Sequence, residues 1–157
     1  MKSLLIILSL ATSPLFANYQ GHPGNSCQFN NNANASTYNA LGGVYNGSNQ
    51  NQSVHCPFVV IGYNDFSQYF HVTYLKRNQG SFYCRAVVSF LDGTTSYGKN
   101  KYACATAGGC LANADNYVAN KDNFLTITMD YGNKVVRDAQ LHCVMNKGSY
   151  IRHYRTQ

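Results

Sequence analysis

Two histidine and cysteine pairs are the residues of this chain that come nearest to a catalytic or metal-binding pattern. His55 directly precedes Cys56, and His142 directly precedes Cys143. A cysteine nucleophile needs an imidazole within hydrogen-bond reach of its sulfur, and a metal site needs both side chains to converge on one ion. Whether either chemistry can occur depends on the backbone that carries each pair.

Both pairs lie in segments with the composition of β-strands, VHCPFVV and DAQLHCVMN. Successive strand residues point to opposite faces, so each histidine diverges from its neighbouring cysteine. Cys56 and Cys143 share their faces with apolar residues, where we expect a disulfide across the core or between sheets instead of a reactive thiolate. Of the first pair, only His55 is open to a functional role, on the outward face. Pro57 predicts that its strand lies at a sheet edge or begins there.

The first residues indicate export. Residues 1–17, MKSLLIILSLATSPLFA, have a charged start, an apolar stretch and a small residue at the end, as a secretory signal peptide does. The apolar stretch is shorter than the roughly 20 residues that cross a bilayer, and no later segment is long and apolar enough to do so. We therefore expect a secreted protein, periplasmic or extracellular, without a membrane span.

All the cysteines follow this segment, and an even number in an oxidising compartment predicts three disulfides. Cys104 and Cys110 bracket a short glycine-containing loop, which we expect a local disulfide to close. The cysteines expected in disulfides are Cys27, Cys56, Cys84, Cys104, Cys110 and Cys143.

The four cysteines outside that loop allow three pairings. We favour a disulfide between Cys84 and Cys143, because both lie on strong core strands. We also favour Cys27 with Cys56, because both lie early in the chain.

The composition is typical of β-structure and loops. The chain contains 13 Tyr and 13 Gly, and its acidic residues are all aspartate, whereas long surface helices are usually rich in glutamate. Short strand-like segments are separated by turn residues, and Asp92-Gly93 predicts a hairpin. We predict an all-β fold, an antiparallel β-sandwich of jelly-roll or immunoglobulin-like type, with about seven to eight short strands.

The length predicts a single folded domain after the leader. We assign residues 1–17 to a signal peptide, residues 18–41 to an Asn-rich lead-in segment and residues 42–157 to the β-sandwich domain.

Other catalytic patterns are absent from the sequence. The five histidines, at positions 22, 55, 71, 142 and 153, show neither HExxH nor a paired spacing on one element. The aspartates fall mostly in turns or at strand ends, although Asp130 and Asp138 could approach across the last hairpin as a glycosidase-like pair. No glycine-rich loop opens a helix, and there is no GxSxG. We expect no catalytic residue, no metal and no cofactor.

Basic and aromatic residues give the strongest indication of a ligand. The chain has 12 Lys and Arg against 6 acidic residues, and all basic residues but the second residue of the chain lie at position 76 or later. Cations interleaved with stackable rings suit acidic glycans, anionic surface polymers and single-stranded nucleic acid. The alternative is that these tyrosines only cover the outer faces of sheets and the lysines only keep the protein soluble. The candidate binding residues are Tyr74, Lys76, Arg77, Tyr83, Arg85, Tyr97, Lys99, Lys101 and Tyr102.

Three segments resemble a loosely defined group of small secreted bacterial proteins. They are GGVYNGSNQNQSVHCPFVV (42–60), the strand with Cys84, and LHCVMNKGSYIRHYR (141–155). That group carries a G-x-aromatic-N-x-S stretch, a V-x-C-P strand and a final segment in which a cysteine precedes G-S-x-I-x-x-Y. The resemblance implies a disulfide-bearing β-sandwich exported by a bacterium. The group is largely uncharacterised, so the resemblance assigns no functional residue.

We expect a non-enzymatic recognition or surface-associated module that binds glycans or anionic surface polymers. One alternative is a small basic secreted hydrolase such as a nuclease, using His55, His71 or His142 with nearby Lys or Arg. Two of these histidines and a cation would then converge in one cleft. Another alternative is a structural or self-assembling extracellular subunit that pairs through an edge strand near Pro57.

Overall fold

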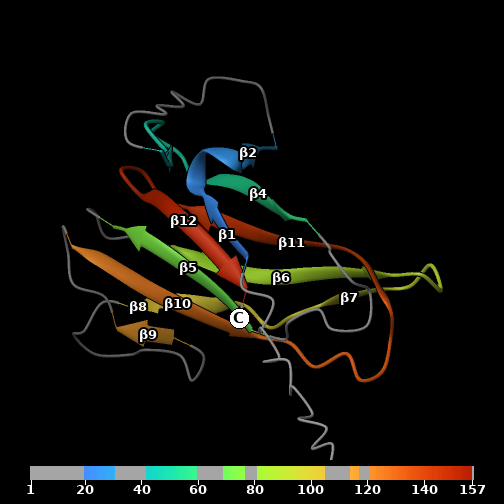
Figure 1. The fold of residues 1–157 in the computed structure, drawn as a ribbon. Coiled ribbons are helices and arrows are strands. Elements are labelled where there is room, and N and C mark those ends of the chain that lie inside the picture. The colour runs from blue at the N-terminus through green and yellow to red at the C-terminus, as the bar shows by residue number, and fades with distance from the viewer. Residues whose placement is uncertain are drawn as a thin grey trace, which may run out of the picture.

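The regular structure consists almost entirely of β-strands, arranged as two sheets around one hydrophobic core (Figure 1). The predicted antiparallel β-sandwich is confirmed. None of the described helical residues form a segment long and apolar enough to cross a membrane. The computed structural model describes residues 20–30, 42–59, 69–76, 81–104, 114–116 and 121–156.

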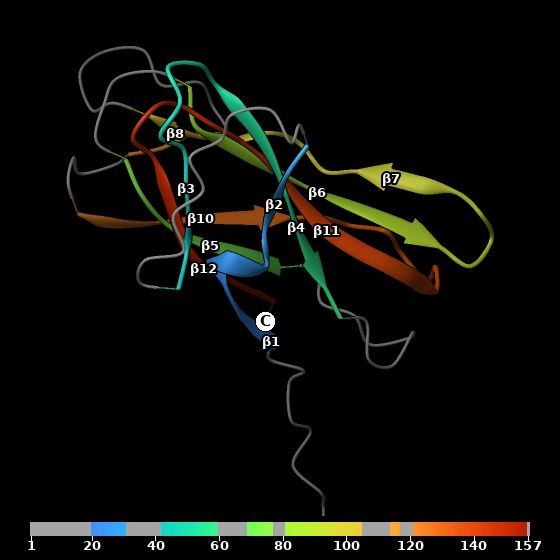
Figure 2. The same ribbon diagram turned by 90° about the horizontal axis from the view of Figure 1, so that it is seen from above.

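The larger sheet has seven strands among the described residues. Its central strand β11 (Val136–Met145) pairs antiparallel with β4 (Gln52–Phe58) on one side and with β6 (Tyr83–Phe90) on the other. Figure 2 shows these three strands side by side. The shorter strands are β2 (Gln28–Phe29) beside β4, β7 (Thr95–Tyr97) and β8 (Lys101–Cys104) beside β6, and β9 (Ala114–Asn116) parallel to β8.

The smaller sheet has five strands among the described residues. In it β12 (Tyr150–Thr156) pairs with β5 (Tyr69–Leu75), and β5 pairs with β10 (Asp122–Thr128). On its other side β12 pairs with β1 (Gln20–Pro23) and with β3 (Val44–Tyr45). A short 3-10 helix, η1 (Gly24–Ser26), leads from β1 in this sheet to β2 in the larger one.

The strand count exceeds the seven to eight that the sequence predicts. Two of the additional strands, β1 and β2, come from the lead-in segment and are too short and polar to show an alternating pattern. Each is held by pairing with a longer strand. The segment after Asp92-Gly93 forms β7 and β8 as two separate strands, and β9 adds another parallel to β8.

Alternation of buried and exposed residues places the side chains as expected for strands with one face in the core. In β6, Cys84, Ala86, Val88 and Phe90 are buried, and the residues between them are partly exposed. In β10 the buried and exposed positions alternate in the same way. Each sheet therefore has one inner face of apolar side chains and one outer face of polar, basic and aromatic ones.

Two disulfides join neighbouring strands of the larger sheet. Cys84 in β6 bonds to Cys143, its partner in the register of β11, and Cys27 bonds to Cys56 of β4. Both predicted pairings are confirmed. The expectation that these bonds cross the core or link the sheets is wrong, because side chains directly opposite on adjacent strands are already close enough to bond. The predicted Cys104–Cys110 disulfide lies outside the described residues.

A hydrogen bond from Tyr154 links the two sheets. Tyr154 of β12 is buried, and its hydroxyl donates to the carbonyl oxygen of Pro57 in β4 at 2.7 Å. Burial raises the pKa of this hydroxyl to about 12, so it keeps its proton at neutral pH. Among the described strands, β2 lies outside β4, so the prediction that the strand with Pro57 lies at the sheet edge is wrong. The described pairing with β2 covers Val54 and His55 and does not reach Pro57.

Asn46 holds the connection between β11 and β12, where the chain passes from one sheet to the other. Its side-chain nitrogen donates to the carbonyl of Met145 at 2.8 Å and to that of Gln50 at 2.9 Å. Its side-chain oxygen accepts from the backbone and the hydroxyl of Ser48. Its backbone pairs with Gly148 and Ser149 in the turn. Asn46 is fully buried, and its polar groups are satisfied by these bonds.

Replacing Asn46 with alanine should destabilise the protein strongly. The change removes the four hydrogen bonds of the Asn46 side chain and leaves the buried Met145 carbonyl without this donor. We therefore expect a loss of about 3 kcal/mol in the free energy of unfolding. Urea unfolding followed by circular dichroism measures it. Asn49 is exposed, so Asn49→Ala should stay within about 0.5 kcal/mol of wild type. Equal losses in the two variants would contradict this role for Asn46.

Candidate functional site

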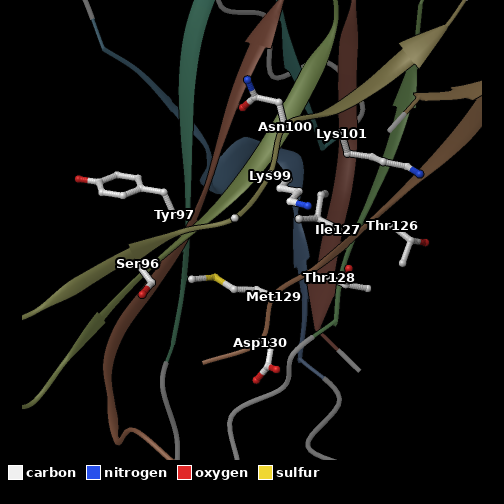
Figure 3. A pocket seen from close by; sticks show the side chains of 11 residues that line it. Ser96, Tyr97, Lys99, Asn100, Lys101, Thr126, Ile127, Thr128, Met129 and Asp130 are labelled. Atoms are coloured by element: carbon white, nitrogen blue, oxygen red, sulfur yellow. The ribbon is translucent and has the colours of Figure 1, made fainter. Parts of the chain in front are cut away.

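A pocket lies between the β7–β8 connection and the end of β10, where the two sheets meet at the side of the sandwich. Its volume is about 470 Å³, within the range of small-molecule sites. Residues 96–101 line one side and residues 126–130 line the other (Figure 3). Three of the predicted binding residues are part of this lining, namely Tyr97, Lys99 and Lys101.

Backbone hydrogen bonds fix the β7–β8 connection against β6. The Gly98 N–H donates to the carbonyl of Ala86 at 2.8 Å, and the Ala103 N–H donates to that of Phe82 at 2.9 Å. Lys99 and Lys101 lie on the backbone between these two anchors. The lysines are thus carried by an ordered segment of the larger sheet.

The pocket combines an apolar floor with cations and neutral hydrogen-bonding groups. Ile127 and Met129 are buried side chains of the opposite wall. Lys99 and Lys101 supply ammonium groups, and Asp130 is the one acidic residue among the lining residues. An oxygen of Asp130 accepts from the Gly132 N–H at 3.0 Å, as expected of an aspartate at a turn. The remaining polar lining groups come from Ser96, Asn100, Thr126 and Thr128.

The outer face of the larger sheet carries aromatic rings and a guanidinium group beside Tyr97. The Arg85 guanidinium lies 5.1 Å from the centre of the Tyr97 ring, a cation–π arrangement. The rings of Tyr83 and Tyr102, opposite each other on β6 and β8, lie 5.0 Å apart. The Tyr97 side chain is 62% exposed, so its ring is open to a ligand.

Some basic residues form salt bridges, but Arg85 and Lys99, close to Tyr97, form none with the described residues. Lys134 pairs with Asp92 at 3.1 Å, and Arg152 pairs with Asp122 at 2.8 Å. Within the described part of the chain, Arg85 and Lys99 have no carboxylate partner. The region around Tyr97 therefore carries a net positive charge.

Two predicted binding residues lie in the core and not on this surface. Tyr74 is fully buried and stacks on Phe82, with ring centres 4.4 Å apart. Lys76 is 2% exposed, and burial lowers the pKa of its ammonium group. The alternation of β5 continues from Phe70 through Tyr74 to Lys76 and turns these side chains inward. Arg77 lies outside the described residues.

Sequence reasoning missed the β10 wall of the pocket. Thr126 and Thr128 carry no motif, and β10 approaches Lys99 and Lys101 only because the two sheets pack together. The alternation in FLTITMD shows which side chains face outward, but it does not show what they lie beside.

The histidines divide between the two sheets. His55 and His142 are opposite each other on β4 and β11, and their rings stack with centres 4.8 Å apart. On the smaller sheet, His71 hydrogen-bonds Thr126 at 3.0 Å. His153 and Thr73 are likewise joined by a hydrogen bond, at 2.9 Å.

Arg85 is the next residue after His142 across the sheet, so two histidines and a cation do lie together. They lie half-buried on the outer face of the larger sheet, and no histidine lines the pocket. Parallel rings 4.8 Å apart leave no room between them for a phosphate group. A nuclease that uses two histidines as general acid and base needs both within reach of the same phosphate, so the stacked rings do not favour that mechanism. The described residues also contain no group of three or more metal-ligating side chains that could hold a metal ion.

No family model, curated protein or solved structure matches this chain.

The stability of the fold should fall on acidification through His142. Burial, then the charges of His55 and Arg85, lower the pKa of His142 in the folded state. The unfolded chain binds this proton more tightly, so stability is highest above the ordinary histidine pKa of about 6.5 and is lost as the pH falls below it.

Chemical unfolding at pH 7.5 and pH 5.5 tests this coupling. The loss of unfolding free energy between the two pH values should be smaller in His142→Gln than in wild type. Val144→Thr, on the same face of β11, adds no titrating group and should keep the wild-type loss. An unchanged loss in His142→Gln would show that this histidine does not contribute.

Proposed function

We propose that the protein is a secreted, non-catalytic binding module that recognises anionic polymers such as acidic glycans. The ligand would bind in the pocket and along the adjoining face of β6, β7 and β8. The observation that carries the proposal is that Tyr97, Lys99 and Lys101 line one cavity with a single acidic lining residue. Arg85 lies outside this lining, over the ring of Tyr97.

The chemistry of the groups supports an acidic sugar polymer as the ligand. Ammonium and guanidinium groups attract carboxylate and sulfate groups, and clefts that carry one sign of charge concentrate ligands of the opposite sign. The exposed ring of Tyr97 offers an apolar face to a sugar ring, and the hydroxyls and amide of the pocket offer hydrogen bonds. A pocket of about 470 Å³ suits a sugar unit of a chain that continues over the sheet.

Removing the two pocket lysines should weaken binding. Dextran sulfate is the test ligand, and uncharged dextran of the same length reports binding to the sugar backbone alone. Lys99→Gln with Lys101→Gln should reduce affinity for dextran sulfate about tenfold, equivalent to about 1.4 kcal/mol. Wild-type affinity should fall as sodium chloride is raised, because salt screens charges near the surface.

A charge-matched variant controls for net charge. Lys121→Gln with Lys147→Gln removes the same number of charges outside the pocket lining and should bind nearly as wild type. Equal loss in both double variants, or salt-independent binding, would contradict a localised anionic site. A single-stranded oligonucleotide that displaces dextran sulfate at much lower concentration would identify nucleic acid as the preferred polymer.

The Tyr97 ring should contribute through its face and not through its hydroxyl. Tyr97→Phe keeps a ring beneath Arg85 and should retain most of the affinity, whereas Tyr97→Ala should lose several-fold. Isothermal titration calorimetry with dextran sulfate measures both. Equal affinities of the Phe and Ala variants for dextran sulfate would show that the ligand does not stack on the ring at position 97.

A further inference from the structure

We propose that His55, His142 and Arg85 form a second anion subsite, which extends the pocket across the larger sheet and engages a polyanion when the two histidines are protonated. The inference rests on the proposed function, and it adds that ligand binding strengthens under mildly acidic conditions.

The register of the larger sheet places these side chains in one row. Gln28 of β2 is opposite His55 of β4, His55 is opposite His142 of β11, and His142 is opposite Arg85 of β6. These strands lie next to one another in Figure 2. Because neighbouring strands are about 4.8 Å apart, the row from His55 to Arg85 spans roughly 10 Å.

Arg85 joins the row to the pocket. Its guanidinium lies over the ring of Tyr97, and Tyr97 lines the pocket. The register places Tyr97 on the outer side of the sheet with Val87, and Lys101 on the inner side with Cys84. Figure 3 accordingly shows their side chains pointing apart. A polymer that occupies the pocket and bends around Tyr97 onto the outer face of β6 reaches Arg85 first, then His142 and His55.

Among the described residues, the surroundings of the two rings contain the Arg85 cation and neutral groups but no carboxylate. The acidic residue of β11 on the outer side, Asp138, lies opposite Ser89 toward the other end of the strand. Within the described residues, four groups near the histidines on this face are charged or can ionise: Arg85, Tyr83, Tyr97 and Tyr102. The other outward neighbours cannot ionise; they are Gln28, Ser53, Pro57, Gln140, Val144 and Val87.

Without a ligand, this geometry opposes protonation. A second positive ring would stack 4.8 Å from the first, beside a guanidinium that has no carboxylate partner among the described residues. Burial, followed by the charges of His55 and Arg85, lowers the pKa of His142. Three polar nitrogens of the cluster, on His55, His142 and Arg85, are buried without a hydrogen-bond partner in the described structure.

A bound polyanion would favour protonation of the two histidines. Its negative groups would neutralise the added charges, so protonation and ligand binding favour each other. Such coupling is reciprocal: acid strengthens polyanion binding by the factor by which the polyanion strengthens proton binding. Lysine and arginine keep their charge throughout this pH range, so the histidines are the source of the effect.

The test measures affinity for dextran sulfate at pH 7.5 and pH 5.5. Sulfate esters stay ionised at both values, so any change reports on the protein. Wild type should gain about tenfold in affinity on acidification, and the double variant His55→Gln with His142→Gln should gain much less. His153→Gln, on the other sheet and outside the pocket lining, is the control and should keep the wild-type gain.

Proton uptake gives a second readout. Calorimetric titrations near pH 6 in two buffers of different ionisation enthalpy should show protons bound on ligand binding by wild type and fewer by the His55→Gln, His142→Gln variant. If that variant does not fold, His55→Lys places a fixed charge in the row and should raise affinity at pH 7.5 with a smaller gain on acidification.

The two proposals fail in different ways. Absence of dextran sulfate binding at both pH values would overturn the proposed function. Binding at pH 7.5 with an equal gain on acidification in wild type and in the folded histidine variants would overturn only the second subsite.

Discussion

The fold depends on the buried hydrogen bonds of Asn46 at the point where the chain leaves one sheet for the other. β11 is the central strand of the larger sheet and β12 pairs with three strands of the smaller one, yet only residues 146–149 separate them. Asn46 binds both ends of this short turn through its side chain and its backbone. The bond from Tyr154 to Pro57 ties the same two sheets further along β12. The relative placement of the sheets, and with it the pocket between them, follows from these polar contacts together with the shared core.

The segments 42–60 and 141–155 meet in this architecture. Asn46 and Ser48 of the first segment and Gly148 and Ser149 of the last one contribute to a single hydrogen-bonded turn. The V-x-C-P strand supplies a disulfide cysteine and the carbonyl that accepts from Tyr154. The pocket residues lie outside these segments, on the β7–β8 connection and β10.

Period-two alternation predicts most of this structure because each long strand has one face in the core. It located β4, β5, β6, β10, β11 and β12 and placed Cys84 and Cys143 on inner faces, where they pair. It could not predict β1 and β2, whose short polar sequences become strands only beside β12 and β4. The inward position of Lys76 was also missed, because a lysine after an aromatic strand suggests a surface. The neighbours of Lys99 across the pocket depend on sheet packing, which no local pattern records.

The two disulfides give the larger sheet a property that the smaller sheet lacks among the described residues. One bond joins Cys27, just before β2, to β4, and the other joins β6 to β11. Both lie behind the outer face that carries Arg85 and the stacked histidines. The smaller sheet relies on hydrogen bonds and packing. Partial opening of the molecule should therefore begin at β1 or β10, with β11 and its neighbours the last to exchange their amide protons. The outer face that carries Arg85 and the two histidines can then keep the spacing of its side chains while the smaller sheet fluctuates.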